Sequence, residues 1–199
     1  MIAVTAVLGY LVGSIPTAGW LARARGVDLR RDGSGNPGTA NALRTAGPWL
    51  AVSVLLVEAA KGLSAVWLGG LIADESGAVA AGLGAVAGNV YNVWYRFAGG
   101  KGLGISLGVL AGLWPWVLPP VIVVIALGAL LTRSAGTASL LAVLALIAIS
   151  LLWPVMEWGT GGLAEEAHLP LIAIGIGAII SWKHWRDSPL NGRDRPAPR

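Results

Sequence analysis

The chain has 199 residues, of which 55% are hydrophobic and only 12% are charged, and its mean hydropathy is +0.71. Uncharged runs long enough to cross a lipid bilayer make up most of it, which excludes an ordinary soluble domain. The absence of cysteine excludes disulfides, zinc–thiolate sites and thiol nucleophiles. We therefore expect an all-α, polytopic membrane helix bundle.

The first apolar run, residues 2–22, has no positive charge before it, unlike a signal peptide. We expect a retained helix with its N-terminus outside. The sequence Gly-Ser-Ile-Pro-Thr at residues 13–17 interrupts this run, and Pro16 should kink the helix and release a backbone carbonyl. This kink is either an irregularity that the membrane bundle tolerates or a part of the lining of a functional site.

The remaining apolar runs predict further spans, about seven in all with two of them short. Pro48 should begin the second span, and Asp74 should end it. Residues 103–132 are too long for one simple span and short for two, and Trp114-Pro115-Trp116 is the natural break. The expected spans are residues 49–73, 76–95, 103–114, 117–132, 137–156 and 167–182.

In this topology every Lys and Arg except Lys61 falls on one side of the membrane. Positive residues favour the cytoplasmic side, so we expect that side and the C-terminus to be cytoplasmic. The net charge of +4 then reflects orientation and not a nucleic-acid partner. We expect residues 1–187 to form a single integral membrane domain and residues 188–199 a basic, disordered tail that at most touches anionic lipid.

One polar stretch, residues 32–44, cannot cross a bilayer as a helix because its glycines, proline and asparagines would leave backbone groups unpaired. Successive glycines let backbone N–H groups curl toward one point, and an arginine adds a permanent cation. The stretch therefore predicts a phosphate-binding loop at the membrane surface. Its candidate residues are Gly33, Ser34, Gly35, Asn36, Gly38, Thr39, Asn41 and Arg44.

A second glycine-rich segment, Gly99-Gly100-Lys101-Gly102, falls on the same side of the membrane. Its spacing does not fit the nucleotide P-loop pattern, so no ATP site is implied. Convergence of Arg44, Lys101 and His184 would give a pocket with enough charge for one or two phosphate groups. Ordinary positive-inside anchoring is the alternative interpretation of the first two cations.

Four polar side chains within the spans need partners. Glu58 and Lys61 are three residues apart on one helix face, so they form a buried pair, or Lys61 reaches the site. Asn89 and Asn92 predict interhelical hydrogen bonds, with lining of the pocket as the alternative. His184 is the only histidine on the predicted cytoplasmic side, which makes it a candidate base.

These motifs resemble the PlsY family of bacterial membrane glycerol-3-phosphate acyltransferases, in order and over the whole chain. The matching segments are residues 13–17, 33–38, 41–44, 61–62 and 99–102. The resemblance implies transfer of a fatty acyl group from acyl phosphate to the sn-1 hydroxyl of glycerol 3-phosphate, giving lysophosphatidic acid and phosphate. It also implies phospholipid biosynthesis at the cytoplasmic face of the bacterial plasma membrane, no cofactor or metal, and transient contact with the soluble enzyme that makes acyl phosphate.

Several positions depart from the family's usual pattern. Thr39-Ala40 reverses its Ala-Thr, and Asn89 and Asn92 replace the His and Pro of its Gly-His-x-Phe/Tyr-Pro. Glu58 replaces the Asp of its Asp-x-x-Lys-Gly, and Asp187 replaces the Asn of its His-x-x-Asn. A paralogue that acylates a different phosphorylated acceptor is therefore an alternative.

An acyl phosphate is already activated, so we expect direct attack by the acceptor hydroxyl, promoted by positioning and electrostatic stabilisation. The proton would pass to His184 or to a phosphate oxygen. A small transporter of anionic metabolites is the rival class, although the predicted cations gather on one side and no internal repeat is evident. The predicted catalytic residues are Ser34, Arg44, Lys101 and His184. The predicted substrate-binding residues are Gly33, Gly35, Asn36, Gly38, Thr39, Asn41, Lys61, Asn89, Gly99, Gly100, Gly102 and Asp187.

Overall fold

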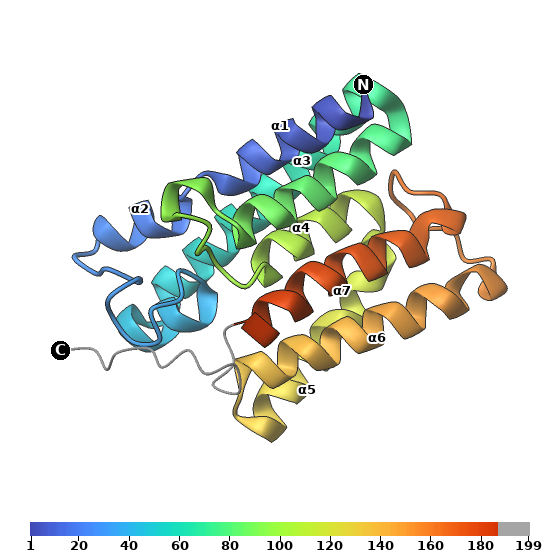
Figure 1. Cartoon of the computed structure of the whole chain (residues 1–199). Helices are drawn as coiled ribbons and strands as arrows, with labels where there is room; N and C mark the ends of the chain where they lie inside the picture. Colours follow the sequence, from blue (N-terminus) through green and yellow to red (C-terminus); the bar gives the residue numbers. More distant parts are fainter. Residues whose placement is uncertain (187–199) are drawn as a thin grey trace.

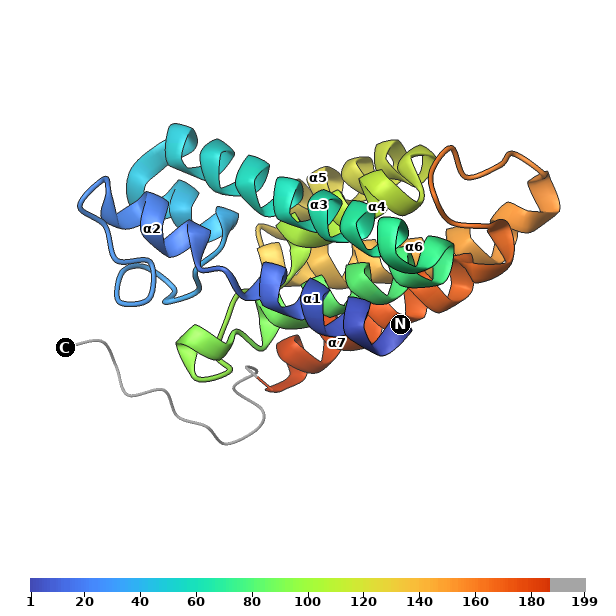
Figure 2. The same ribbon diagram turned by 90° about the horizontal axis from the view of Figure 1, so that it is seen from above.

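The computed structural model describes residues 1–186, whose regular structure is entirely helical, without a strand. The helices lie side by side in one bundle (Figure 1 and, turned by 90°, Figure 2). Four stretches of these residues are long and apolar enough to cross a membrane, namely 2–23, 39–95, 115–132 and 135–156. The longer elements are α1 (Ile2–Ser14), α2 (Thr17–Arg23), α3 (Thr39–Val90), α4 (Leu103–Leu113), α5 (Leu118–Thr132), α6 (Ala135–Met156) and α7 (Leu169–Arg186), and the short 3-10 helices are η1 (Val93–Tyr95), η2 (Pro115–Val117) and η3 (Glu166–His168).

The element α3 consists of two long arms that fold back on each other. The backbone leaves helical geometry at Ala73 and Asp74, where Asp74 has a φ of 48°. Near its start, Gly47 has a φ of 80°, and Pro48 then begins the first arm at a position where a missing N–H costs nothing. The second and third predicted spans are therefore the two arms, residues 48–72 and 75–90.

The other predicted interruptions are also present. Helix α1 ends at Ser14 and α2 begins at Thr17, so the chain breaks around Pro16. Helix α4 ends at Leu113, and η2 separates it from α5. The indole of Trp114 is buried in the main core and meets Trp153 of α6 edge to face, with ring centroids 5.1 Å apart.

Small residues let α1 lie directly against the second arm of α3. A Cβ atom added to Gly9 would stand 2.0 Å from the carbonyl oxygen of Ala81, and one added to Gly13 would stand equally close to that of Ala85. On the second arm of α3, a Cβ atom added to Gly84 or Gly88 would likewise clash with the backbone of α1. This is the small-residue spacing that allows helix backbones to touch in a membrane.

The glycine-rich segments gather at one end of the bundle. Residues 24–38, residues 91–102, the α5–α6 turn and the end of α7 lie at that end (Figure 1). The N-terminus, the bend at Asp74 and the loop of residues 157–165 lie at the opposite end (Figure 1). The two polar loops predicted to share one side of the membrane therefore lie at the same end of the bundle.

Replacing Gly9 with alanine is expected to destabilise the bundle, because the new methyl group cannot fit without separating two backbones. Overpacking of this kind costs roughly 1–3 kcal/mol, which should lower the thermal midpoint in detergent by several degrees. Gly70→Ala is the matched control, since its nearest contact is an ordinary 3.4 Å to a Leu163 methyl group. Equal midpoints for the two variants would contradict the close packing of α1.

Candidate active site

The loop of residues 24–38 is folded around one buried amide, that of Asn41, which is 1% exposed. Its Nδ2 donates to the carbonyls of Leu29, at 2.9 Å, and Asp32, at 3.0 Å, and its Oδ1 accepts from the backbone N–H of Ser34 at 2.8 Å. Gly33 has a φ of +61°, and a Cβ there would stand 2.4 Å from Asn41 Oδ1. The buried Asn41 amide therefore fixes the backbone conformation of the loop.

The second loop, which carries Lys101, is held against the end of α3. The N–H of Gly99 donates to the carbonyl of Val90 at 3.0 Å, and the N–H of Gly100 donates to that of Asn89 at 3.1 Å. A Cβ on Gly99 would stand 2.0 Å from the Asn89 carbonyl oxygen. Only a residue without a side chain allows this approach, so the glycines fix how Lys101 is presented.

Two hollows meet between these loops. The inner hollow lies among loop residues and three helices, and its polar lining includes Asn36, Thr39, Glu58, Asn89, Lys101 and Ser139. The outer hollow is lined by Arg30, Ser34, Gly35, Asn36, Ala98, Gly99, Lys101, Lys183 and Arg186. Asn36 and Lys101 belong to both linings, so the hollows are neighbours with one lysine at their boundary.

The outer hollow is strongly cationic. Four of its lining residues, Arg30, Lys101, Lys183 and Arg186, carry positive charge, and none of its described lining residues is acidic. Arg30 lies over the ring of Tyr95, 4.6 Å from its centroid, and Arg186 lies over Tyr91 at 5.8 Å. A pocket of this composition attracts phosphate groups.

Not every predicted site residue lies in these hollows. Arg44 is exposed on α3 and lines neither of them. His184 is half-buried on α7, with Nδ1 2.9 Å from its own helix's Ile180 carbonyl, beside Gly136 of α6. Asp187 lies outside the described residues. The functional roles of these three residues remain predictions.

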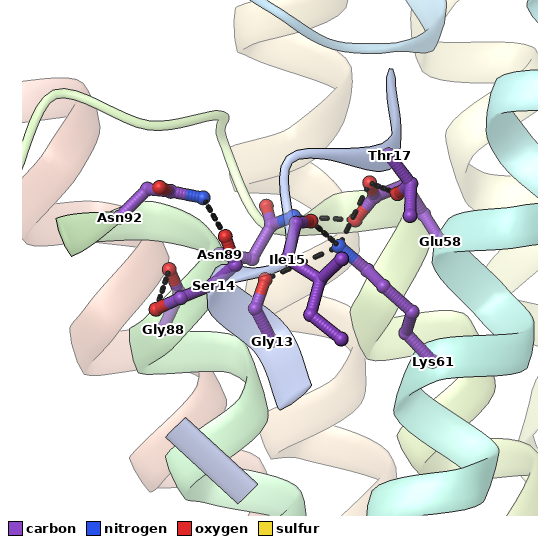
Figure 3. A network of polar contacts seen from close by, with 9 residues as sticks. All are labelled: Gly13, Ser14, Ile15, Thr17, Glu58, Lys61, Gly88, Asn89 and Asn92. Atoms are coloured by element: carbon purple, nitrogen blue, oxygen red, sulfur yellow. Dashed lines mark hydrogen bonds and ion pairs between the residues drawn. The ribbon is translucent and has the colours of Figure 1, made fainter. Parts of the chain in front are cut away.

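Figure 3 shows a polar network that joins the break after α1 to both arms of α3. Lys61 Nζ lies 3.0 Å from Glu58 Oε1 and donates to the carbonyls of Gly13, at 3.2 Å, and Ile15, at 2.8 Å. Both charged side chains are less than 10% exposed. The predicted buried pair is therefore present, and Lys61 lines neither hollow, whereas Glu58 lines the inner one.

Asn89 of the second arm and Asn92, two residues after its end, make the predicted hydrogen bonds to neighbouring segments (Figure 3). Asn92 Nδ2 donates to the Ser14 carbonyl at 2.7 Å, and Asn89 Nδ2 donates to Glu58 Oε2. Thr17, the first residue of α2, donates its hydroxyl to Glu58 Oε1 at 3.0 Å. The released carbonyls at the Pro16 break are thus satisfied by side chains, and Asn89 also reaches the inner hollow.

Sequence reasoning did not find Arg30, Ser139, Lys183 or Arg186 as site residues. Lys183 and Arg186 are three residues apart at the end of a helix, so their shared face was a usable signal. Ser139 lies in an uncharged, mostly apolar run, and its hydroxyl donates to the Ala135 carbonyl of its own helix at 2.6 Å. Nothing in the sequence separates it from a structural serine.

The long apolar helices define a multi-pass membrane protein, and its loops and helix ends form a hollow lined by cations at one end. The chain belongs to the glycerol-3-phosphate acyltransferase family, because the model of that family matches residues 3–189. It is therefore an acyltransferase.

Named relatives and solved structures agree with this assignment. A glycerol-3-phosphate acyltransferase of Symbiobacterium thermophilum is 40% identical over 92% of this chain and 86% of its own, and one of Synechococcus sp. (strain JA-3-3Ab) is 44% identical over 90% and 84%. The crystal structure of PlsY (YgiH), an integral membrane glycerol 3-phosphate acyltransferase, in its glycerol 3-phosphate form is 30% identical. It superposes with a TM-score of 0.76 over 98% of this chain and 94% of its own. The lysophosphatidic acid form gives a TM-score of 0.69 at 28% identity, with the same coverage.

Asn41→Ala is expected to loosen the loop while leaving the bundle folded, because the three bonds that are lost all lie within residues 29–41. At about 1 kcal/mol per bond, limited proteolysis within residues 24–38 should accelerate at least tenfold, and acyl transfer should fall. Thr45→Val removes only a bond to the Asn41 carbonyl within the helix and serves as the control. An unchanged cleavage rate in Asn41→Ala would contradict the role assigned to this amide.

Proposed function

We propose that this protein transfers a fatty acyl group from acyl phosphate to the sn-1 hydroxyl of glycerol 3-phosphate. The products are lysophosphatidic acid and inorganic phosphate. The observation that carries the proposal is the hollow lined by Arg30, Lys101, Lys183 and Arg186 beside a glycine-rich loop, at the end of a membrane bundle. The solved relative with glycerol 3-phosphate and lysophosphatidic acid forms supports this acceptor and this product.

The choice of acyl phosphate as donor rests on the chemistry of the site. Phosphate is a good leaving group once cations take up its charge, and the outer hollow offers four cations. A chain without cysteine has no thiol to form an acyl-enzyme, and an activated donor does not need one. Both substrates carry a phosphate group, so two anions must be held close together, and this requires several cations in one place.

In the proposed step the acceptor oxygen forms a bond to the acyl carbon while the bond from that carbon to the phosphate oxygen breaks. Lys101 lies at the boundary of the hollows, where it can contact the phosphate of the donor during attack. The backbone of residues 33–38 and Ser34 orient the donor. Arg44 lies just after this loop but lines neither hollow, so its predicted role is left to the Arg44→Gln variant described below. His184 lines neither hollow, so we assign the hydroxyl proton to an oxygen of the leaving phosphate.

The acceptor hydroxyl lies in the inner hollow in this scheme, among Thr39, Asn89 and Ser139. The acyl chain lies between helices within the membrane. The soluble enzyme that supplies acyl phosphate docks transiently at the same end of the bundle. A different phosphorylated acceptor is the alternative substrate, because Asn89 and Thr39 depart from the family pattern where the inner hollow is built.

The central test is a two-substrate assay with the purified full-length protein in detergent. Acyl phosphate and glycerol 3-phosphate should give lysophosphatidic acid and phosphate in equal amounts, whereas acyl-CoA should give none. Other phosphorylated polyols test the acceptor. Product formation without separate compartments would exclude transport as the sole activity, and the absence of product with every donor would contradict the proposal.

Lys101→Gln should lower kcat about 100-fold or more, because one charge that stabilises the leaving phosphate is lost. Arg133→Gln removes one charge at the same end of the bundle from an exposed turn that lines neither hollow, and its kcat should stay within about twofold of the wild type. Arg44→Gln tests the predicted role of Arg44 in the same series. Equal activity of Lys101→Gln and Arg133→Gln would contradict the phosphate role of Lys101.

We place this catalytic end in the cytoplasm and the N-terminus outside, on the distribution of Lys and Arg. The chain lacks cysteine, so single cysteines report sidedness directly. In intact bacteria, an impermeant maleimide should label Glu157→Cys but not Arg25→Cys, and both should react after lysis. Both positions are exposed in the fold. The reverse labelling pattern would overturn the orientation.

A further inference from the structure

Glu58 is a carboxylate inside a membrane helix that nevertheless reaches the site. It is 6% exposed, and part of it lines the inner hollow. Three side chains hold its two oxygens: Lys61 and Thr17 contact Oε1, and the Asn89 amide contacts Oε2 (Figure 3). A carboxylate held by three partners has a fixed orientation, and its charge is compensated by the buried ammonium group.

Lys61 has no donor left for a substrate. An ammonium group has three N–H bonds, and Lys61 Nζ faces three acceptors: the carbonyls of Gly13 and Ile15 and the carboxylate of Glu58. It therefore anchors the carboxylate to the break after α1. The group that extends from this anchor toward the hollow is Asn89.

Asn89 connects the carboxylate to the loop that carries Lys101. Its side chain is held by Glu58, and its backbone carbonyl accepts the N–H of Gly100, the residue before Lys101. A Cβ on Gly100 would stand 3.0 Å from Asn89 Oδ1, so the loop lies directly against this side chain. A displacement of Asn89 must therefore displace the backbone on which Lys101 is carried.

We infer that Glu58 and Asn89 act as one positioning unit that sets the place of Lys101 between the two hollows. The inference rests on the phosphate role proposed above for Lys101. The side-chain lengths in the unit are matched. A shorter carboxylate at position 58 would leave a gap, and the longer imidazole of histidine at position 89 would close it.

The test is a double-mutant cycle on the full-length protein with Glu58→Asp, Asn89→His and the two combined. We measure kcat, the KM of each substrate and the dissociation constant of inorganic phosphate, which reports on the cationic hollow without turnover. Each single variant should lower kcat and weaken phosphate binding about tenfold, and the double variant should return both to within about threefold of the wild type.

Ser14→Ala is the matched control. It removes a buried hydrogen bond, 3.1 Å long, to the carbonyl of Gly88, next to Asn89 but without contact to Glu58. It should lower the thermal midpoint as much as the single variants do, yet leave kcat and phosphate binding within about twofold. Losses that simply multiply in the double variant, or equal losses in Ser14→Ala, would overturn the inference. If the wild type formed no product but its phosphate binding followed the cycle, the proposed function would fail and the positioning unit would stand.

Discussion

The fold depends on satisfying the backbone carbonyls exposed where the first helix breaks. Within a bilayer no water is available to bond such groups, and each unsatisfied one costs several kcal/mol. Lys61 bonds the carbonyls of Gly13 and Ile15, and Asn92 bonds that of Ser14. A buried lysine requires a counter-charge in turn, and Glu58 on the same helix face supplies it. One irregularity near Pro16 thus accounts for three of the polar side chains inside the bundle.

The same arrangement explains why the site stands where it does. The break redirects the chain into α2, which packs against the first arm of α3, and the glycine-rich loop follows α2. The carboxylate that balances Lys61 is also the partner of Asn89, whose backbone holds the second loop. The second loop is therefore tied to the buried network, and the outer hollow collects its four cations from three segments that are distant in sequence: residues 24–38, residues 99–102 and α7.

The sequence predicts much of this fold because apolar length and helix breakers are local signals. The positions of the breaks at Pro16, Pro48 and Trp114 follow from the chemistry of proline and glycine. The gathering of four cations in one hollow cannot be predicted from the sequence, because the approach of Lys183 and Arg186 to Lys101 depends on how α7 packs beside α3. Asn41 illustrates the same limit: its residue type fits a phosphate loop, and only the structure shows its amide bonded to the loop backbone. Sequence motifs identify the loops, whereas packing decides which side chains face the hollow.

The glycines of α1 that face α3 make the position of this helix rigid. Gly9 and Gly13 bring α1 into backbone contact with the second arm of α3, and such a contact cannot be loosened by small steps. The link to α2 is of a different kind, since it is a short extended segment held by hydrogen bonds that can exchange one at a time. Within the first 23 residues, α1 is therefore held rigidly, whereas its connection to α2 can change conformation. Of these two connections, only the one at residues 14–17 can change without separating two packed backbones.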